Sequence, residues 1–133
     1  MSEQNLETSR RIVELWNAGQ MDTLRELFDE DVVMHHPKGW PEPGPSVGRD
    51  AVFRQYETLR QDWSSDRLEV VQRRAVEDCV VVQQRWQAQG SHSGATSEML
   101  LSSVGRYRDG KVVLVAFFWD WDEALAAAAR GGT

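Results

Sequence analysis

The chain has 133 residues, of which 41% are hydrophobic and 27% are charged, so it is long enough for one globular domain spanning residues 1–133. Its formal net charge is −6 and its Lys and Arg residues are scattered, which argues against a nucleic-acid partner. A single cysteine excludes an internal disulfide, no Cys/His cluster has metal-site spacing, and no secretion signal or membrane-spanning run is seen, so we expect a cytoplasmic protein without a membrane partner.

The first half of the chain predicts three helices and one strand. Apolar residues recur at helical spacing over residues 5–18, and Gly19 ends that helix. Asp22 can cap a second, short helix, and a third helix is expected over residues 48–62. Between them, residues 32–36 alternate as a strand does. The residues expected to face inward from the helices are Leu6, Ile12, Val13, Trp16, Leu24, Leu27, Phe28, Val52, Tyr56, Leu59 and Trp63.

The second half of the chain predicts strands joined by turns. Between the strand at residues 32–36 and the third helix, residues 37–47 contain four prolines and two glycines, which predicts an irregular loop. Asp109-Gly110 indicates a tight hairpin that leads into a last strand over residues 111–121. A short alanine-rich helix capped by Asp122 is expected to end near Arg130. The strands expected before the hairpin span residues 67–76, 79–90 and 97–108.

This order of elements predicts an α+β domain, in which helices pack on one face of a bent sheet. The face of the last strand that is expected to point inward carries Val113, Val115, Phe117, Trp119 and Trp121, and the outer face carries Leu114, Ala116 and Phe118. A sheet with one solvated face has polar residues on that side, so something must cover the outer face here. A second copy of the chain is the simplest cover and predicts a homodimer. The tail helix is the alternative.

Several short motifs follow one another along the chain: Leu15-Trp16-Asn17-Ala18-Gly19-Gln20-Met21-Asp22, Leu27-Phe28, Val33-Met34-His35-His36-Pro37, Arg85-Trp86-Gln87-Ala88-Gln89-Gly90-Ser91-His92-Ser93-Gly94 and Tyr107-Arg108-Asp109-Gly110-Lys111-Val112. The first three resemble the opening of the nuclear-transport-factor-2-like superfamily, and the last two resemble its SnoaL-like branch, which is named for polyketide cyclases. The resemblance covers almost the whole chain. It implies a cone-shaped, strongly curved antiparallel sheet with three covering helices around a pocket, and a dimer formed through the outer face of the sheet.

His36 is the first catalytic candidate. By alternation it shares a face with Val32 and Met34, so it is expected to point into the core or a pocket. The resemblance places it where steroid isomerases of the superfamily carry a catalytic aspartate base. An imidazole can take and return a proton there, because its free pKa of about 6.5 lies near working pH. The alternative is a buried neutral histidine that only satisfies a backbone carbonyl.

Tyr56 and Ser103 are the other catalytic candidates. Tyr56 falls where related isomerases place a tyrosine in the pocket wall, where its hydroxyl would donate to an oxyanion or orient His36. The alternative is an ordinary core tyrosine. Ser103 stands where SnoaL-like cyclases carry an acidic residue, and it could only steady an oxyanion. The resemblance also implies losses: Ile12 replaces a tyrosine of the steroid isomerases, and Phe117 replaces an aspartate of the limonene-epoxide-hydrolase relatives.

The chain has six tryptophans, and together they could form an aromatic box for a planar or polycyclic apolar ligand. The alternative is that they are ordinary core residues. Trp40 differs from the others because it lies in the proline-rich loop, which makes it the expected lid residue. The residues predicted to bind ligand are Trp16, Met34, Trp40, Trp63, Trp86, Met99, Phe117 and Trp119.

Other polar residues are weaker candidates. Apolar alternation over residues 79–90 turns Trp86 inward and Arg85 outward, whereas a bulge, or the comparison with epoxide hydrolases, would turn Arg85 inward. His35 is expected at the surface or at a subunit contact. His92 lies near a turn, where it would reach the pocket rim or solvent.

Three functions follow as hypotheses. The first is an isomerase- or cyclase-type enzyme that needs no cofactor or metal and transfers a proton on an apolar small molecule, with His36 as base and acid. The second is a non-catalytic protein that binds such a ligand. The third is a dimeric interaction domain without chemistry in its pocket.

Overall fold

The computed structural model describes residues 2–42, 44–61, 63–90 and 94–132. Its helices are α1 (Ser2–Asn17), α2 (Met21–Arg25), α3 (Arg49–Gln61) and α4 (Trp121–Ala129). Its strands are β1 (Phe28–His35), β2 (Ser46–Val47), β3 (Trp63–Val76), β4 (Cys79–Gly90), β5 (Thr96–Arg108) and β6 (Lys111–Phe118). Within the described ranges, no helix combines the length and the apolar character needed to cross a membrane.

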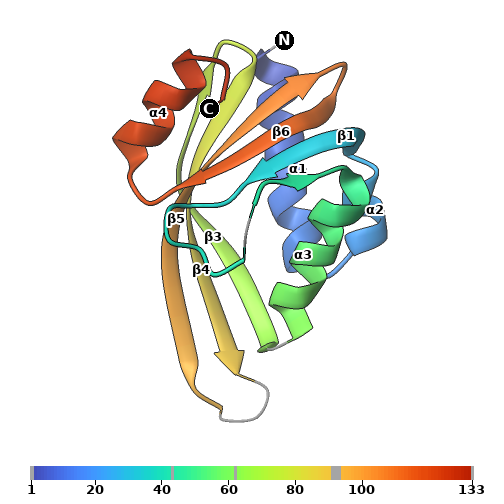
Figure 1. The fold of residues 1–133 in the computed structure, drawn as a ribbon, viewed down its shortest axis with the longest axis vertical. Helices are drawn as coiled ribbons and strands as arrows, with labels where there is room; N and C mark the ends of the chain where they lie inside the picture. Colours follow the sequence, from blue (N-terminus) through green and yellow to red (C-terminus); the bar gives the residue numbers. More distant parts are fainter. Residues whose placement is uncertain (1, 43, 62, 91–93, 133) are drawn as a thin grey trace.

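The strands form one six-stranded sheet in the order β2-β1-β6-β5-β4-β3. Neighbouring strands are antiparallel except for β1 and β6, which run parallel. Figure 1 shows the sheet strongly bent, with α1, α2 and α3 on one side and α4 on the other. The predicted α+β class, with three covering helices and a short C-terminal helix, is confirmed. The parallel β1–β6 pair is a departure from the predicted antiparallel sheet.

Alternation along β4 sorts its side chains between two apolar layers. Val80 and Val82 join the inner cluster with residues of α1, α2 and α3, whereas Cys79 and Val81 join an outer cluster with α4. The helix α4 contributes the buried residues Ala124, Ala127 and Ala128 to that outer cluster. The tail helix therefore covers the outer face of the sheet here, as the sequence allowed. The homodimer stays a prediction.

The last strand is shorter than predicted. β6 ends at Phe118, and Trp121 begins α4 and packs against the outer cluster. The chain leaves the sheet here because Asp120 caps α4, its side chain accepting a 3.0 Å hydrogen bond from the backbone N–H three residues later. The predictions that Trp119 lies on the inward face of this strand and that Asp122 is the cap are therefore wrong.

Two element boundaries also differ from the prediction. Phe28 begins β1 instead of lying on the second helix, because it pairs with Val112 of β6. β3 begins at Trp63, before the predicted start at residue 67, because it continues to pair with β4 as far as Gly90. These long-range pairings extend strands into segments whose local sequence favours helix or turn.

An irregularity in β6 changes which valines face inward. Tyr107 pairs with Val112 and Arg106 pairs with Leu114, so Val113 is an extra residue in the strand. Val112 consequently joins the inner cluster, where strict alternation placed Val113.

Replacing Asp120 by Ala should lower the free energy of unfolding by about 1 kcal/mol, because a helix N-cap is lost. The matched control is Asp122→Ala, which changes an acidic residue in the first turn that is not the N-cap and should cost no more than about 0.5 kcal/mol. Urea unfolding followed by circular dichroism measures both. Equal losses in the two variants would contradict the assigned cap.

Candidate functional site

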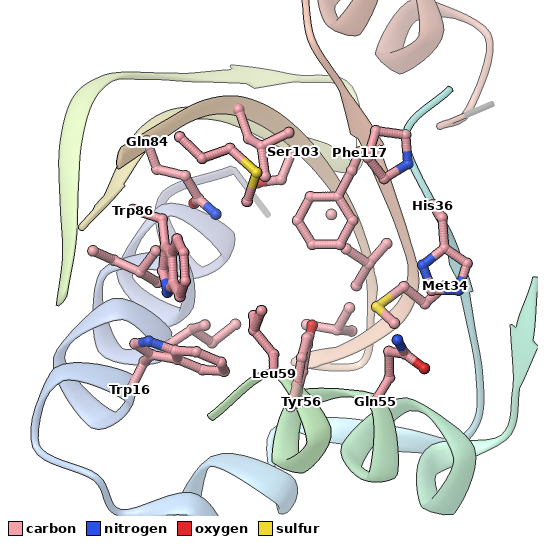
Figure 2. Close-up of a pocket in the computed structure, with 18 of the residues that line it drawn as sticks. Trp16, Met34, His36, Gln55, Tyr56, Leu59, Gln84, Trp86, Ser103 and Phe117 are labelled. Carbon is pink, nitrogen blue, oxygen red and sulfur yellow. The ribbon is translucent and has the colours of Figure 1, made fainter. Parts of the chain in front are cut away.

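The bent sheet and the helices α1–α3 enclose a cavity of about 230 Å³ (Figure 2). Most of its wall is made of aromatic and aliphatic side chains. Apart from the tryptophans, the polar side chains in the wall are His36, Glu42, Gln55, Tyr56, Thr58, Gln84 and Ser103. The cavity therefore combines a large apolar surface with a few hydrogen-bonding groups, which is the usual composition of a small-molecule site.

Most of the predicted site residues line this cavity. They are His36, Tyr56, Ser103, Trp16, Met34, Trp40, Trp86, Met99 and Phe117. Trp63 does not line it and packs edge-on against Trp86, with ring centroids 5.2 Å apart. Trp119 does not line it either: it is 46% exposed, and its Nε1 donates a 2.8 Å hydrogen bond to the carbonyl of Lys38. Trp119 lies outside the cavity because β6 ends before it.

Alternation along β4 decides which side chains reach the cavity. Gln84 and Trp86 point inward (Figure 2), whereas Arg85 points away and forms ion pairs with Glu69 at 2.7 Å and with Glu98 at 2.8 Å. The pairing of β4 with β5 continues without a register shift along this stretch. The predicted orientation of Trp86 and Arg85 is therefore confirmed.

His36 directly follows β1 and packs against the proline-rich loop. A Cβ atom at Gly44 would collide with the His36 ring, so this loop position requires glycine. The Trp40 ring lies parallel to the imidazole, with 3° between the planes and 6.5 Å between the centroids. The His36 Nε2 is 3.3 Å from the hydroxyl oxygen of Ser46. The loop therefore fixes the position of the imidazole in the cavity wall.

Burial lowers the pKa of His36 below its ordinary value of 6.5, because desolvation disfavours the charged imidazolium. The Glu42 carboxylate acts in the opposite direction and raises this pKa, while His35 lowers it. The imidazole is therefore neutral at pH 7 and can accept a proton.

Tyr56 comes from α3 and is held by neighbouring rings. It makes edge-to-face contacts with Trp16 and with Phe53, each with centroids 5.3 Å apart. Burial raises the pKa of Tyr56, and Tyr107 raises it further, so the hydroxyl stays protonated. Figure 2 shows this hydroxyl directed into the cavity. In the described part of the chain, no hydrogen bond joins the Tyr56 hydroxyl to His36, so no contact supports the prediction that Tyr56 orients His36.

Sequence reasoning missed a buried carboxylate beside the cavity. The Asp66 side chain is 6% exposed, and its Oδ2 accepts hydrogen bonds from Nε1 of Trp16 at 2.7 Å and from Nε1 of Trp86 at 3.0 Å. Its Oδ1 lies 3.2 Å from Nη1 of Arg60. A signal was present, because Asp66 continues the alternation of Leu68 along the strand. It fell outside the predicted strand, which began at residue 67.

His35 and His92 were the two weaker histidine candidates. His35 is half-buried and does not line the cavity. His92 lies outside the described residues. In the described ranges, no group of three or more His, Cys, Asp or Glu side chains is arranged to hold a metal ion.

The family model for the SnoaL-like domain matches residues 9–115. The chain belongs to the SnoaL-like family. This confirms the resemblance drawn from the motifs on β1, on β4 and at the β5–β6 hairpin. A comparison with curated proteins found no match.

Several solved structures are similar to this SnoaL-like chain. Bal32a, from a soil-derived mobile gene cassette, is 28% identical with a TM-score of 0.78, and the match covers 87% of this chain and 88% of Bal32a. A nuclear-transport-factor-2-like protein from Burkholderia pseudomallei is 19% identical with a TM-score of 0.77, covering 92% and 95%. IdmH, a proposed polyketide cyclase from Streptomyces antibioticus, is 22% identical with a TM-score of 0.75, covering 96% and 99%. These likenesses establish the fold, whereas function must come from the site.

An NMR titration of His36 should give a pKa below 6.5, because burial favours the neutral ring. Glu42→Gln should lower this pKa further, since it removes the carboxylate that stabilises the imidazolium. Glu57→Gln alters an exposed carboxylate of α3 that does not line the cavity, and it should leave the pKa unchanged. A parent value above 6.5, or an upward shift in Glu42→Gln, would show that this electrostatic assignment is wrong.

Proposed function

We propose that this SnoaL-like protein is a cofactor-independent enzyme of the isomerase or cyclase type, which moves a proton on an apolar small molecule. The observation that carries the proposal is a neutral, half-buried imidazole, that of His36, in the wall of a mostly apolar cavity. A histidine with a lowered pKa is a competent general base at neutral pH, and its conjugate acid can return the proton. In the tautomer in which the His36 Nε2–H donates to the Ser46 hydroxyl, Nδ1 keeps the lone pair that would accept the proton of the ligand.

The second component of the proposed site is a hydrogen-bond donor for the charge that develops after proton removal. The Tyr56 hydroxyl stays protonated and points into the cavity (Figure 2), so it can donate to a carbonyl oxygen of the ligand as that oxygen becomes negative. Ser103 and Gln84 lie on the opposite wall and offer further donors. These groups are all uncharged, so the stabilisation would come from oriented dipoles.

The wall also indicates the ligand's charge. Among the described residues that line the cavity, Glu42 is the one with a formally charged side chain, and no Lys or Arg lines it. An anionic ligand would therefore meet no counter-ion, whereas an uncharged ring compound would bury apolar area against the aromatic wall. We propose neutral cyclic ketones, lactones and polyketide-like aromatics as the substrate class. The similarity to the proposed polyketide cyclase IdmH supports the last of these.

The proline-rich loop is proposed to act as a lid over the imidazole. Pro37, Trp40 and Glu42 of this loop line the cavity, and the loop is tied to the end of β6 by the Trp119–Lys38 hydrogen bond. The Trp40 Nε1 is buried with no hydrogen-bond partner among the described residues. A ligand oxygen placed beside Trp40 would satisfy this donor and close the lid on the ligand.

The second candidate is a protein that binds the same ligands without converting them. It is favoured by Ser103 and Phe117, because neither side chain can serve as a second acid in the wall.

A homodimer is proposed separately. A second copy would meet the part of the outer face where Leu100, paired in the sheet with Arg85, is 43% exposed.

His36→Ala should lower kcat/KM by about 10²–10⁴-fold on any ketone, lactone or polyketide-like aromatic that the parent converts, because the general base is removed. His35→Ala is the matched control and should keep most of the activity, since His35 does not line the cavity. In the parent, kcat/KM should fall as the pH drops below 6.5 and His36 becomes protonated. If the parent binds several of these compounds and its melting temperature rises, yet it converts none, the enzyme proposal fails and the binding function replaces it.

A further inference from the structure

One carboxylate holds two walls of the cavity together. Trp16 belongs to α1 and Trp86 to β4, and both indole N–H groups donate to the same oxygen of Asp66 on β3, at 2.7 and 3.0 Å. Figure 2 shows the two indole nitrogens near each other at the end of the cavity opposite His36. Asp66 itself does not line the cavity. It therefore affects the cavity only through the two rings.

The carboxylate and its partners leave the rings little freedom. The second oxygen of Asp66 pairs with Arg60, whose guanidinium lies over the Trp16 ring at 4.8 Å and whose Nη1 donates to the Trp16 carbonyl at 3.4 Å. Trp16 is thus fixed at its N–H edge, at its face and at its backbone. Trp86 is fixed at its N–H edge by Asp66 and is contacted edge-on by Trp63. Charge-assisted hydrogen bonds of this kind are short and directional.

Fixed aromatic walls discriminate between ligands by shape. A planar aromatic ring can lie against a rigid indole at van der Waals distance, whereas a saturated ring of the same skeleton is puckered and thicker. Any turn of the indoles to admit a thicker ring would break the hydrogen bonds that Asp66 accepts from them. Without the carboxylate, the rings could adjust to either shape, because a binding surface that can repack is less selective.

We propose that Asp66 is a positioning residue that makes the cavity selective for planar aromatic ligands over their saturated counterparts. The inference rests on the proposed function, because it assumes that the cavity binds a small molecule. It adds the ligand property that the site selects and the residue that sets it. The His36 end of the cavity, with its proton-accepting imidazole, is separate from this selection.

The positioning role is tested first without ligand, by the indole N–H resonances of ¹⁵N-labelled protein. In Asp66→Asn, the resonances of Trp16 and Trp86 should move upfield, because a neutral amide oxygen is a weaker acceptor than a carboxylate. Those of Trp40, Trp119 and Trp121 should stay in place. Glu69→Gln changes an exposed ion-paired carboxylate on the same strand and should move neither resonance. Unchanged Trp16 and Trp86 resonances in Asp66→Asn would overturn the positioning role.

The selectivity is tested with 2-naphthol and decahydro-2-naphthol, which share a skeleton and a hydroxyl group but differ in planarity. The parent and Glu69→Gln should bind 2-naphthol about three- to tenfold more tightly, as measured by calorimetry. The ratio of the two dissociation constants should fall in Asp66→Asn and approach one in Asp66→Ala. If Asp66→Ala does not fold, Asp66→Asn decides. An unchanged ratio, with both ligands weakened equally, would mean that Asp66 only stabilises the fold and overturns the inference alone. If the parent binds neither compound, the inference is overturned; if it also binds none of the ketones, lactones and polyketide-like aromatics, the proposed function is overturned with it.

Discussion

The cavity depends on a sheet whose central strands are covered on both faces over part of their length. Protein interiors normally pack without voids larger than a water molecule, so a cavity of about 230 Å³ persists only if its walls cannot collapse. Here α4 packs its alanines against the outer face of β4 and β5, while the inner face of β4 meets α1. The sheet is thus held from outside as well as from inside. Because small side chains allow α4 to approach the sheet closely, the strands have little room to move away from the helices.

The sequence predicted those parts of the fold that local patterns determine. Strict alternation over residues 79–90 placed Trp86 inside and Arg85 outside, and both positions are correct. Trp119 was misplaced because two local patterns overlap there: the apolar alternation favours a strand, whereas Asp120 favours the start of a helix. The cap prevailed, and the strand ended. Asp66 was missed for a different reason. Its inward position continues the alternation of the strand, but its role depends on partners 50 and 20 residues away in sequence, which that alternation does not identify.

The two titratable groups at opposite ends of the cavity illustrate which buried groups stay available for chemistry. Asp66 has both carboxylate oxygens occupied. One accepts hydrogen bonds from two indole N–H groups and the other pairs with Arg60, so no oxygen of this carboxylate is left without a partner for a ligand. Among the described residues, His36 has one hydrogen-bonding contact, at 3.3 Å to Ser46, beside its parallel packing with Trp40, and its environment favours the neutral form. A neutral base with a free lone pair is reactive, whereas a fully paired carboxylate is structural. Proximity to the cavity alone would not have separated them.

The composition of the wall also bears on the type of reaction. A hydrolase must take a proton from water and give one to the leaving group, either through two groups or through one group that does both in turn. In the described wall, His36 is the imidazole and Glu42 the carboxylate, and both belong to the loop side of the cavity. The remaining polar groups are amides and hydroxyls, which orient a ligand and stabilise charge but do not carry a proton away. A base on the loop side with neutral donors opposite suits the proposed reaction, in which the proton taken from one atom returns to the same molecule. Isomerisation and ring closure have this proton balance.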